Sequence, residues 1–204
     1  DFDKFVAADY TITTTEAGGG DATETIITGD GGLLKITNDA ADDDLDFLQW
    51  KGHASGTIEN YKYEAAKDLY YSVRFQTNDA TQSELAIGLI ITDTDPFTSV
   101  TDGIFFRKAD GDATLQFVVE KDGTESTLDV AELADDTFIT VGFYYDTKDR
   151  QFHVYKNNKE IGKVVNTNAP DDEELAISFG IKNGEAVAKV LTLDYINVAK
   201  ERTA

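Results

Sequence analysis

The stretch 137–165, TFITVGFYYDTKDRQFHVYKNNKEIGKVV, indicates the fold class more clearly than any other part of the chain. From 139 to 145, apolar and aromatic side chains occupy every second position, which is the period of a strand with one buried face. The polar turn DTKDR (146–150) follows, and the alternation resumes over 151–155 as in a returning strand. A second reversal at 157–159 is rich in Asn, which tolerates positive φ. The stretch therefore predicts antiparallel strands with a buried aromatic face.

The same period-two pattern recurs on both sides of this hairpin, with turn signals every 8 to 12 residues or so. No segment keeps an apolar period of 3.6 residues, so we expect helices to be short or missing. The 204 residues contain only two prolines and suit a single domain of sandwich size. We predict an all-β fold, an antiparallel jelly-roll β-sandwich. The predicted strands lie at 24–27, 33–37, 69–76, 85–91, 104–108, 114–120, 128–130, 139–145, 151–155, 175–181 and 189–198.

The charge balance excludes two classes of partner. The chain has 39 acidic and 18 basic residues, a net charge of −21. Nucleic acid binding needs clustered Lys and Arg to neutralise phosphates, and an anionic membrane would repel this protein. The N-terminal stretch has no basic leader and no continuous apolar core, so we expect neither a signal peptide nor a spanning helix. There is no cysteine, which rules out disulfides and thiolate metal sites.

The N-terminal residues are the least patterned part of the chain. Three consecutive glycines at 18–20 indicate a flexible loop, and Phe2, Phe5 and Tyr10 stand among polar residues. A segment with so few apolar residues gains little from burial on its own. We therefore predict an N-terminal arm over 1–24, whose three aromatic side chains contact a partner, and a single β-sandwich domain over 25–204.

Four stretches together resemble a group of tailed-bacteriophage virion structural proteins. They are LYYSVRFQTNDATQSELAIGLIITDTDP (69–96), DGIFFRKADGDATLQFVVEKDG (102–123), DDTFITVGFYYD (135–146) and DYINVAKER (194–202). The resemblance covers about two thirds of the chain, from residue 69 onward. It implies a concanavalin A-like, laminin-G-like β-sandwich. It also implies a capsid decoration (cement) protein that binds the outer capsid surface and stabilises the head.

What the resemblance implies about partners is equally specific. Members look like homotrimers that sit on the major capsid protein, so the expected location is the virion, after synthesis in the host bacterial cytoplasm. A carbohydrate-binding, lectin-like module on the virion surface or on a fibre is the alternative. Both are non-enzymatic, and we expect no enzyme.

One motif invites a catalytic interpretation. Glu120, Asp122 and Glu125 have the E-x-D-x-x-E spacing of laminarinase-like enzymes, which need two carboxylates ~5.5 Å apart on one strand facing a groove. Asp122 and Gly123, however, have the composition of a hairpin turn, which would place the two glutamates on opposite strands. Of the two histidines, His53 and His153, each is expected to be a surface or packing residue rather than a zinc ligand.

Two acidic loops have a composition that could suit calcium. The loop TDTDPFTSVTDG (92–103) offers Asp93, Asp95 and Asp102, and lectins of this fold place calcium beside an aromatic platform. Asp and Thr also satisfy loop backbone groups without any ion. The run NDAADDDLDF (38–47) lacks the EF-hand spacing and is interpreted as an ordinary solvated loop. We expect no cofactor, with calcium at Asp93, Asp95 and Asp102 as the candidate metal site.

Overall fold

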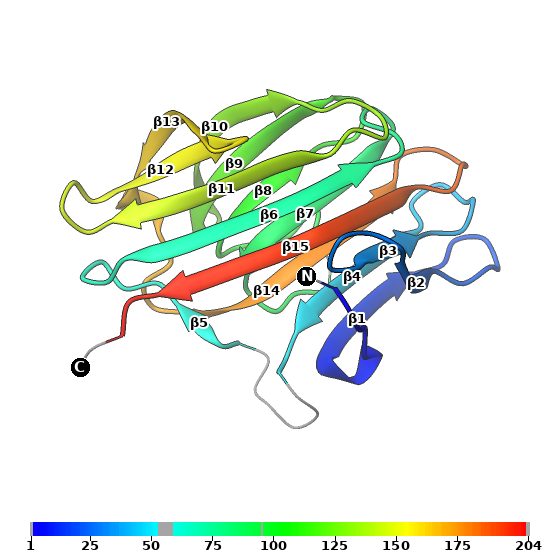
Figure 1. Cartoon of the computed structure of the whole chain (residues 1–204), viewed down its shortest axis with the longest axis horizontal. Helices are drawn as coiled ribbons and strands as arrows, with labels where there is room; N and C mark the ends of the chain where they lie inside the picture. The colour runs from blue at the N-terminus through cyan, green and yellow to red at the C-terminus, as the bar shows by residue number, and fades with distance from the viewer. Residues whose placement is uncertain (1, 53–58, 95, 203–204) are drawn as a thin grey trace.

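The computed structural model of the chain describes residues 2–52, 59–94 and 96–202. These residues form two antiparallel sheets packed face to face (Figure 1), which confirms the predicted all-β sandwich. The only helices in the described ranges are two short 3₁₀ turns, Ala7–Asp9 and Asn166–Asn168. None of the described helices has the length and apolar composition that a membrane crossing requires. Two predicted residues, His53 and Asp95, lie outside the described ranges.

The eight-stranded sheet has the order β1-β4-β14-β7-β8-β9-β10, with the short β5 beside β14. The seven-stranded sheet has the order β13-β12-β11-β6-β15-β3-β2. The eight-stranded sheet comprises β1 (Tyr10–Thr15), β4 (Leu45–Trp50), β5 (Tyr61–Lys62), β7 (Ser83–Ile90), β8 (Gly103–Lys108), β9 (Thr114–Lys121), β10 (Thr124–Glu132) and β14 (Glu174–Asn183). The seven-stranded sheet comprises β2 (Thr23–Ile27), β3 (Leu33–Thr37), β6 (Leu69–Thr77), β11 (Ile139–Asp146), β12 (Gln151–Lys156), β13 (Lys159–Val165) and β15 (Val190–Lys200).

The stretch 137–165 forms β11 and β12 as predicted, and after the second turn it continues into a further strand, β13, which the pattern did not predict. Phe143 pairs with Val154 across the first hairpin, and Asn157 and Asn158 take the second turn with φ of 47° and 64°. Phe143 is fully buried, and its ring stacks on that of Tyr71 with 5.4 Å between centroids. Phe117 lies 5.3 Å from Phe143 across the sandwich. Such aromatic contacts add about 0.5–1.5 kcal/mol per pair to the gain from burial, so they stabilise the interior between the sheets.

A second apolar cluster covers the outer face of the eight-stranded sheet. Phe47 and Phe105 are buried there, and Phe97 of the 92–103 loop packs edge-on against Phe47 at 5.9 Å. The two glycines below make room, because a Cβ at Gly180 would lie 2.5 Å from the Phe47 ring and one at Gly88 would lie 2.5 Å from Phe105 Cβ. The protein's own side chains therefore fill this face of the sheet.

The N-terminal segment differs from the predicted arm. Residues 10–15 form β1, which pairs along its whole length with β4 at the edge of the eight-stranded sheet. Phe2 is 8% exposed and contacts Phe179 edge-on, and Phe5 stacks on Tyr10. The Thr-rich strand has the β-propensity to pair, and the aromatic residues find a core to bury against. The segment thus lies on the sandwich in the single chain, and the partner contacts of Phe2, Phe5 and Tyr10 stay a prediction.

Candidate functional site

The predicted calcium loop is held by hydrogen bonds of its own. Ser99 Oγ lies 3.3 Å from Asp93 Oδ2, and the Asp93 amide donates to Gln49 Oε1 at 3.2 Å. Asp102 is 4% exposed and accepts from the amide of Asp122 at 3.3 Å. Asp93 and Asp102 are not gathered with a third ligand in the described residues. Calcium at this loop therefore stays a prediction.

The E-x-D-x-x-E motif spans a hairpin turn, as the sequence predicted. Glu120 on β9 and Glu125 on β10 are direct Cα partners, and Asp122 occupies the turn with a φ of 50°. The two carboxylates therefore come from opposite strands. Arg107 forms an ion pair with Glu125 at 2.9 Å.

Glu120 has one property of a general acid. It is 7% exposed, and burial, followed by the charge of Glu125, raises the pKa of its carboxyl to about 7. The cavity that it lines with Phe97 and Arg107 has a volume of only about 100 Å³. Ligand pockets usually measure ~300–1,000 Å³, so this carboxyl does not face a groove of substrate size. The absence of catalysis stays a prediction.

A second group of ligand atoms lies at the β11–β12 turn. Oxygen and nitrogen atoms of Asp146, Asp149 and His153 are within 4.8 Å of one another, the only such group among the described residues. His153 contacts Asp149 at 3.0 Å and Glu160 at 3.2 Å through its two ring nitrogens, and Lys163 donates to Asp149 at 2.8 Å. This network satisfies the group without a metal, which agrees with the prediction that His153 is a surface or packing residue.

A larger hollow lies on the outer face of the seven-stranded sheet. Its volume is about 310 Å³. Gly142 on β11 has Ser72 of β6 as its Cα partner on one side and Tyr155 of β12 on the other. Two residues further along the same strands, Tyr144 has Tyr70 as its Cα partner. The hollow, called here the tyrosine hollow, is lined by Tyr70, Ser72, Thr140, Val141, Gly142, Tyr144, Tyr155 and Asn158.

Small residues form the floor of the tyrosine hollow and rings form its walls. A Cβ at Gly142 would lie 2.6 Å from the Tyr71 carbonyl oxygen, so the close approach of β6 requires glycine at this position. Ser72 is buried at 6% exposure, whereas Tyr70 is 42% exposed. The surface is hollowed at this point because the small side chains of the floor lie between the larger tyrosine rings.

Tyr144 is fixed in place by Asp68. Its hydroxyl donates to Asp68 Oδ2 at 2.5 Å, and Asp68 Oδ1 accepts from the amide of Thr147 at 3.0 Å. The hydrogen bond to Asp68 raises the pKa of Tyr144 to about 12, and the same bond is the main cause of the lowered pKa of Asp68. The Tyr144 hydroxyl is therefore neutral, and its hydrogen bond to Asp68 fixes the orientation of the ring.

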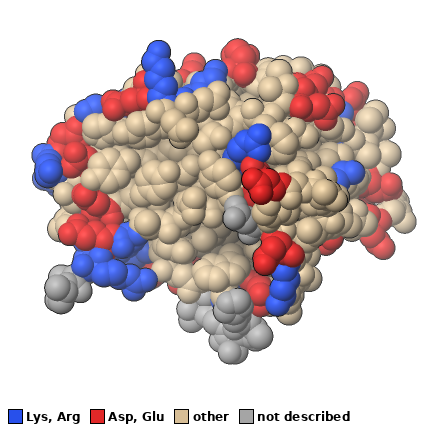
Figure 2. Space-filling view, in the orientation of Figure 1, with Lys and Arg blue, Asp and Glu red and all other residues tan. Residues whose placement is uncertain are grey.

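No charged residue of the described chain lines the tyrosine hollow itself. Figure 2 views this face, and uncharged atoms cover the area over β6 and β11, while acidic and basic side chains gather at its margins. Arg74, beside the hollow on β6, forms an ion pair with Asp194 and lies over the ring of Phe138. The chain as a whole carries a net charge of −21, yet the middle of this face is uncharged (Figure 2).

The comparisons with known proteins concern the fold. No family model matches the sequence, and no curated protein sequence matches it. Among solved structures, the chain is similar to a Bacteroides ovatus GH16 protein from a mixed linkage glucan PUL, with a TM-score of 0.64 and 12% identity over 98% of both chains. It is also similar to the carbohydrate recognition domain of Emp46p, with a TM-score of 0.60 and 10% identity over 94% of this chain and 88% of that one.

A third similar structure is the endo-beta-1,4-glucuronan lyase of Trichoderma reesei, with a TM-score of 0.56 and 9% identity over 91% of this chain and 89% of that one. Two of these three proteins are named for enzymes or enzyme families and one for a recognition domain, so the likeness does not distinguish catalysis from binding. At such low identity it shows the fold alone, a concanavalin A-like β-sandwich.

Proposed function

We propose that the protein binds neutral carbohydrate at the tyrosine hollow and does not cleave it. The observation that carries the proposal is the arrangement of Tyr70, Tyr144 and Tyr155 around the low floor of Gly142 and Ser72. A pyranose ring has an apolar C–H face and a rim of hydroxyls. Tyrosine offers a flat apolar ring with a polar end, which matches both parts of the sugar.

The size and polarity of the hollow limit the length and the charge of the sugar that it can bind. A volume of about 310 Å³ is at the lower end of the usual range for ligand pockets, which suits a short segment of one or two sugar rings. Thr140, Ser72 and the exposed Asn158 provide hydroxyl and amide groups at the floor and edge. The net charge of −21 disfavours sulfated or uronic acid glycans through long-range repulsion.

The structural neighbours support a carbohydrate ligand at the level of class. Their names describe a carbohydrate recognition domain, a GH16 protein in complex with a product, and a glucuronan lyase. The absence of catalysis is supported by the small volume of the cavity at Glu120.

Capsid decoration is the second candidate, and one observation favours a contact between copies. The two edge strands of the seven-stranded sheet expose β-branched apolar side chains, Ile26 and Ile27 on β2 and Ile161 and Val165 on β13. Unpaired edges of this kind are ready to pair with another chain. The major capsid protein as partner, the homotrimer and the virion location stay predictions from the resemblance. Co-sedimentation with empty capsids and light scattering of the free protein would test them.

The test of carbohydrate binding uses variants of matched chemistry. The wild type is screened on an array of neutral glycans, and the best ligand is titrated by calorimetry against Tyr70→Ala, Tyr144→Ala and Tyr195→Ala. Tyr195 lies on the same outer face of the sheet, beside Arg74 and outside the hollow. We expect the first two substitutions to weaken binding at least tenfold and Tyr195→Ala to leave it unchanged. Binding that all three variants retain would exclude the tyrosine hollow.

A further inference from the structure

The interior holds carboxylate oxygens that nothing in the described chain satisfies. Asp46 on β4 has an exposed fraction of 0%, and no N–H or O–H group of the described chain donates to either of its side-chain oxygens. Glu16 Oε2 is also buried without a partner, although its Oε1 accepts from the amide of Ala22 at 3.0 Å. These are three of the six buried side-chain polar atoms without a partner in the described ranges. Buried polar groups are nearly always paired, so each exception needs a cause.

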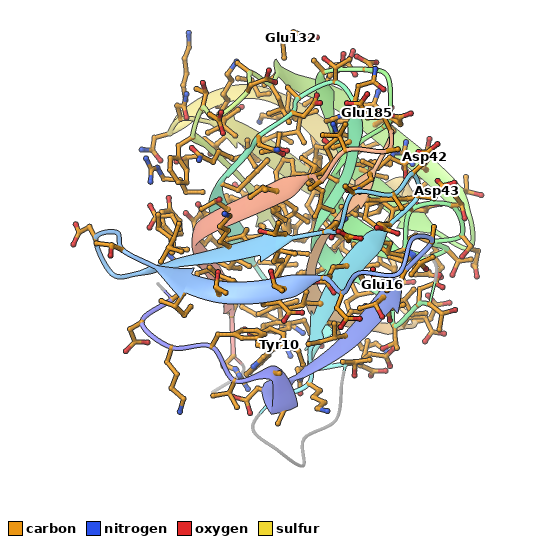
Figure 3. All side chains as sticks on the ribbon, turned by 90° about the vertical axis from the view of Figure 1, so that its right-hand side faces the viewer. Tyr10, Glu16, Asp42, Asp43, Glu132 and Glu185 are labelled. Atoms are coloured by element: carbon orange, nitrogen blue, oxygen red, sulfur yellow. The ribbon has the colours of Figure 1, made fainter. Side chains whose placement is uncertain are left out.

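The register of the strands explains why these groups converge. Asp46 pairs with Thr14 of β1 and Ile181 of β14, and it lies on the core-facing side of β4 with Leu48. Glu24 on β2 pairs with the buried Ile36, which places Glu24 on the core-facing side of the other sheet. Figure 3 looks onto this edge of the sandwich and labels Glu16, where the chain leaves β1 toward β2.

The pKa of the Asp46 carboxyl agrees with this arrangement. Burial, then the charge and hydrogen bonding of Glu24, and then the charge of Glu16 together raise its pKa from 3.8 to about 8. Two carboxylates cannot form a hydrogen bond unless a proton lies between them. Lys182 cannot supply a positive charge, because it alternates to the outer face and pairs with Asp43 at 2.7 Å.

We infer that Asp46, Glu24 and Glu16 form a binding site for a divalent cation of the calcium type. Hard cations favour several carboxylate oxygens, and the three free oxygens of Asp46 and Glu16 are suitable donors. Glu16 and Glu24 are only half-buried, so an ion can enter between them and keep some of its water. The ligand atoms of Asp46, Glu24 and Glu16 are not all within 4.8 Å of one another, because the only such group in the described residues is that of Asp146. A bound ion is therefore expected to draw β1 and β2 closer together.

This site differs from the acidic loop that precedes it. Asp44 accepts hydrogen bonds from the amides of Ala17 and Ala41, and Asp43 forms an ion pair with Lys182. These aspartates hold the loop together. Among the aspartates of this run, only Asp46 has buried side-chain oxygens that accept no hydrogen bond in the described chain.

Calcium binding is measured by calorimetry and by thermal unfolding on protein first treated with chelator. We expect one site in the wild type, and at a calcium concentration of 100 times the Kd the folded-to-unfolded ratio rises about a hundredfold. Asp46→Asn should abolish both the heat of binding and the stabilisation, and Glu16→Gln should weaken binding. Asn matches the shape of the protonated Asp46 side chain, so the variant is expected to fold without calcium.

Three control variants distinguish this site from calcium binding elsewhere on the protein. Asp43→Asn, in the same loop, and Tyr70→Ala, in the tyrosine hollow, should keep the full calcium response. Asp102→Asn tests the rival loop at 92–103 and should also keep it. If calcium gives no heat, or if its effect survives in Asp46→Asn, the cation site is excluded, and a proton shared between Asp46 and Glu24 accounts for the pair.

Discussion

Replacing Tyr71 by Phe is expected to stabilise the protein. Tyr71 is fully buried on β6, its ring stacks on Phe143 at an interplanar angle of 9°, and its hydroxyl has no hydrogen-bond partner in the described chain. Burial alone raises its pKa. A buried polar group without a partner costs about 1–3 kcal/mol, and Phe keeps the ring contacts while it removes that cost. We expect a gain of about 1 kcal/mol in the free energy of unfolding, or roughly 2–4 °C in Tm for a chain of this size.

Tyr145 provides the matched control for this substitution. It is equally buried on β11, but its hydroxyl donates to the Ala65 carbonyl at 3.1 Å and accepts from Asn166 at 3.3 Å. Tyr145→Phe should therefore destabilise the protein by about 0.5–1.5 kcal/mol, the usual net value of a hydrogen bond. Urea unfolding followed by circular dichroism measures both variants. A loss of stability in Tyr71→Phe equal to that in Tyr145→Phe would refute the reasoning, since it would mean that the Tyr71 hydroxyl is hydrogen-bonded.

Three further outcomes follow from the interior and from the sheet edge. Phe143→Ala should cost about 3–5 kcal/mol in urea unfolding, the usual range for a buried aromatic residue cut to alanine, and a cost below about 1 kcal/mol would place Phe143 outside the core. Phe2→Ala should cost about 1.5–3 kcal/mol, because Phe2 is 8% exposed, whereas an unchanged Tm would mean that residue 2 contributes nothing to the folded sandwich. Without calcium, Asp46 should make stability depend on pH. Burial, Glu24 and Glu16 raise its pKa from 3.8 to about 8, so the folded state favours the protonated carboxyl. The stabilisation that this group gives the fold is therefore full below about pH 4 and is lost as pH rises through 8. The stability of the wild type relative to Asp46→Asn should fall over that range by up to about 1.4 kcal/mol per pH unit, and a constant difference would contradict the raised pKa.

Local periodicity was sufficient to predict most of the sandwich. The alternation in 69–76, 85–91 and 139–145 identified β6, β7 and β11, and the strands predicted at 24–27 and 33–37 are β2 and β3. The sequence pattern did not predict a strand whose formation depends on pairing with a distant strand. The Thr-rich stretch at 10–15 has little apolar alternation, yet it becomes β1 because β4 offers an open edge and Phe179 offers a surface for Phe2.

Both proposed sites depend on contacts that local patterns do not reveal. Tyr70 and Tyr144 were each predictable as outward residues of a strand, but only the pairing of β6 with β11 brings them together over Gly142. Asp46 belongs to an acidic run with the composition of a solvated loop, and its inward direction follows from the start of β4 at Leu45. The opposite-strand placement of Glu120 and Glu125 was predicted, because a single turn fixes it.

The position of a bound sugar on the protein tests the central claim most directly. Crystals soaked with the best neutral glycan, or chemical-shift changes of the tyrosine rings in solution, would locate the ligand. The account predicts a sugar ring packed against Tyr70 and Tyr144 above Gly142, with the hydroxyl of Tyr144 still bonded to Asp68. A sugar bound instead on the outer face of the eight-stranded sheet, beside Phe97 and Glu120, would contradict it.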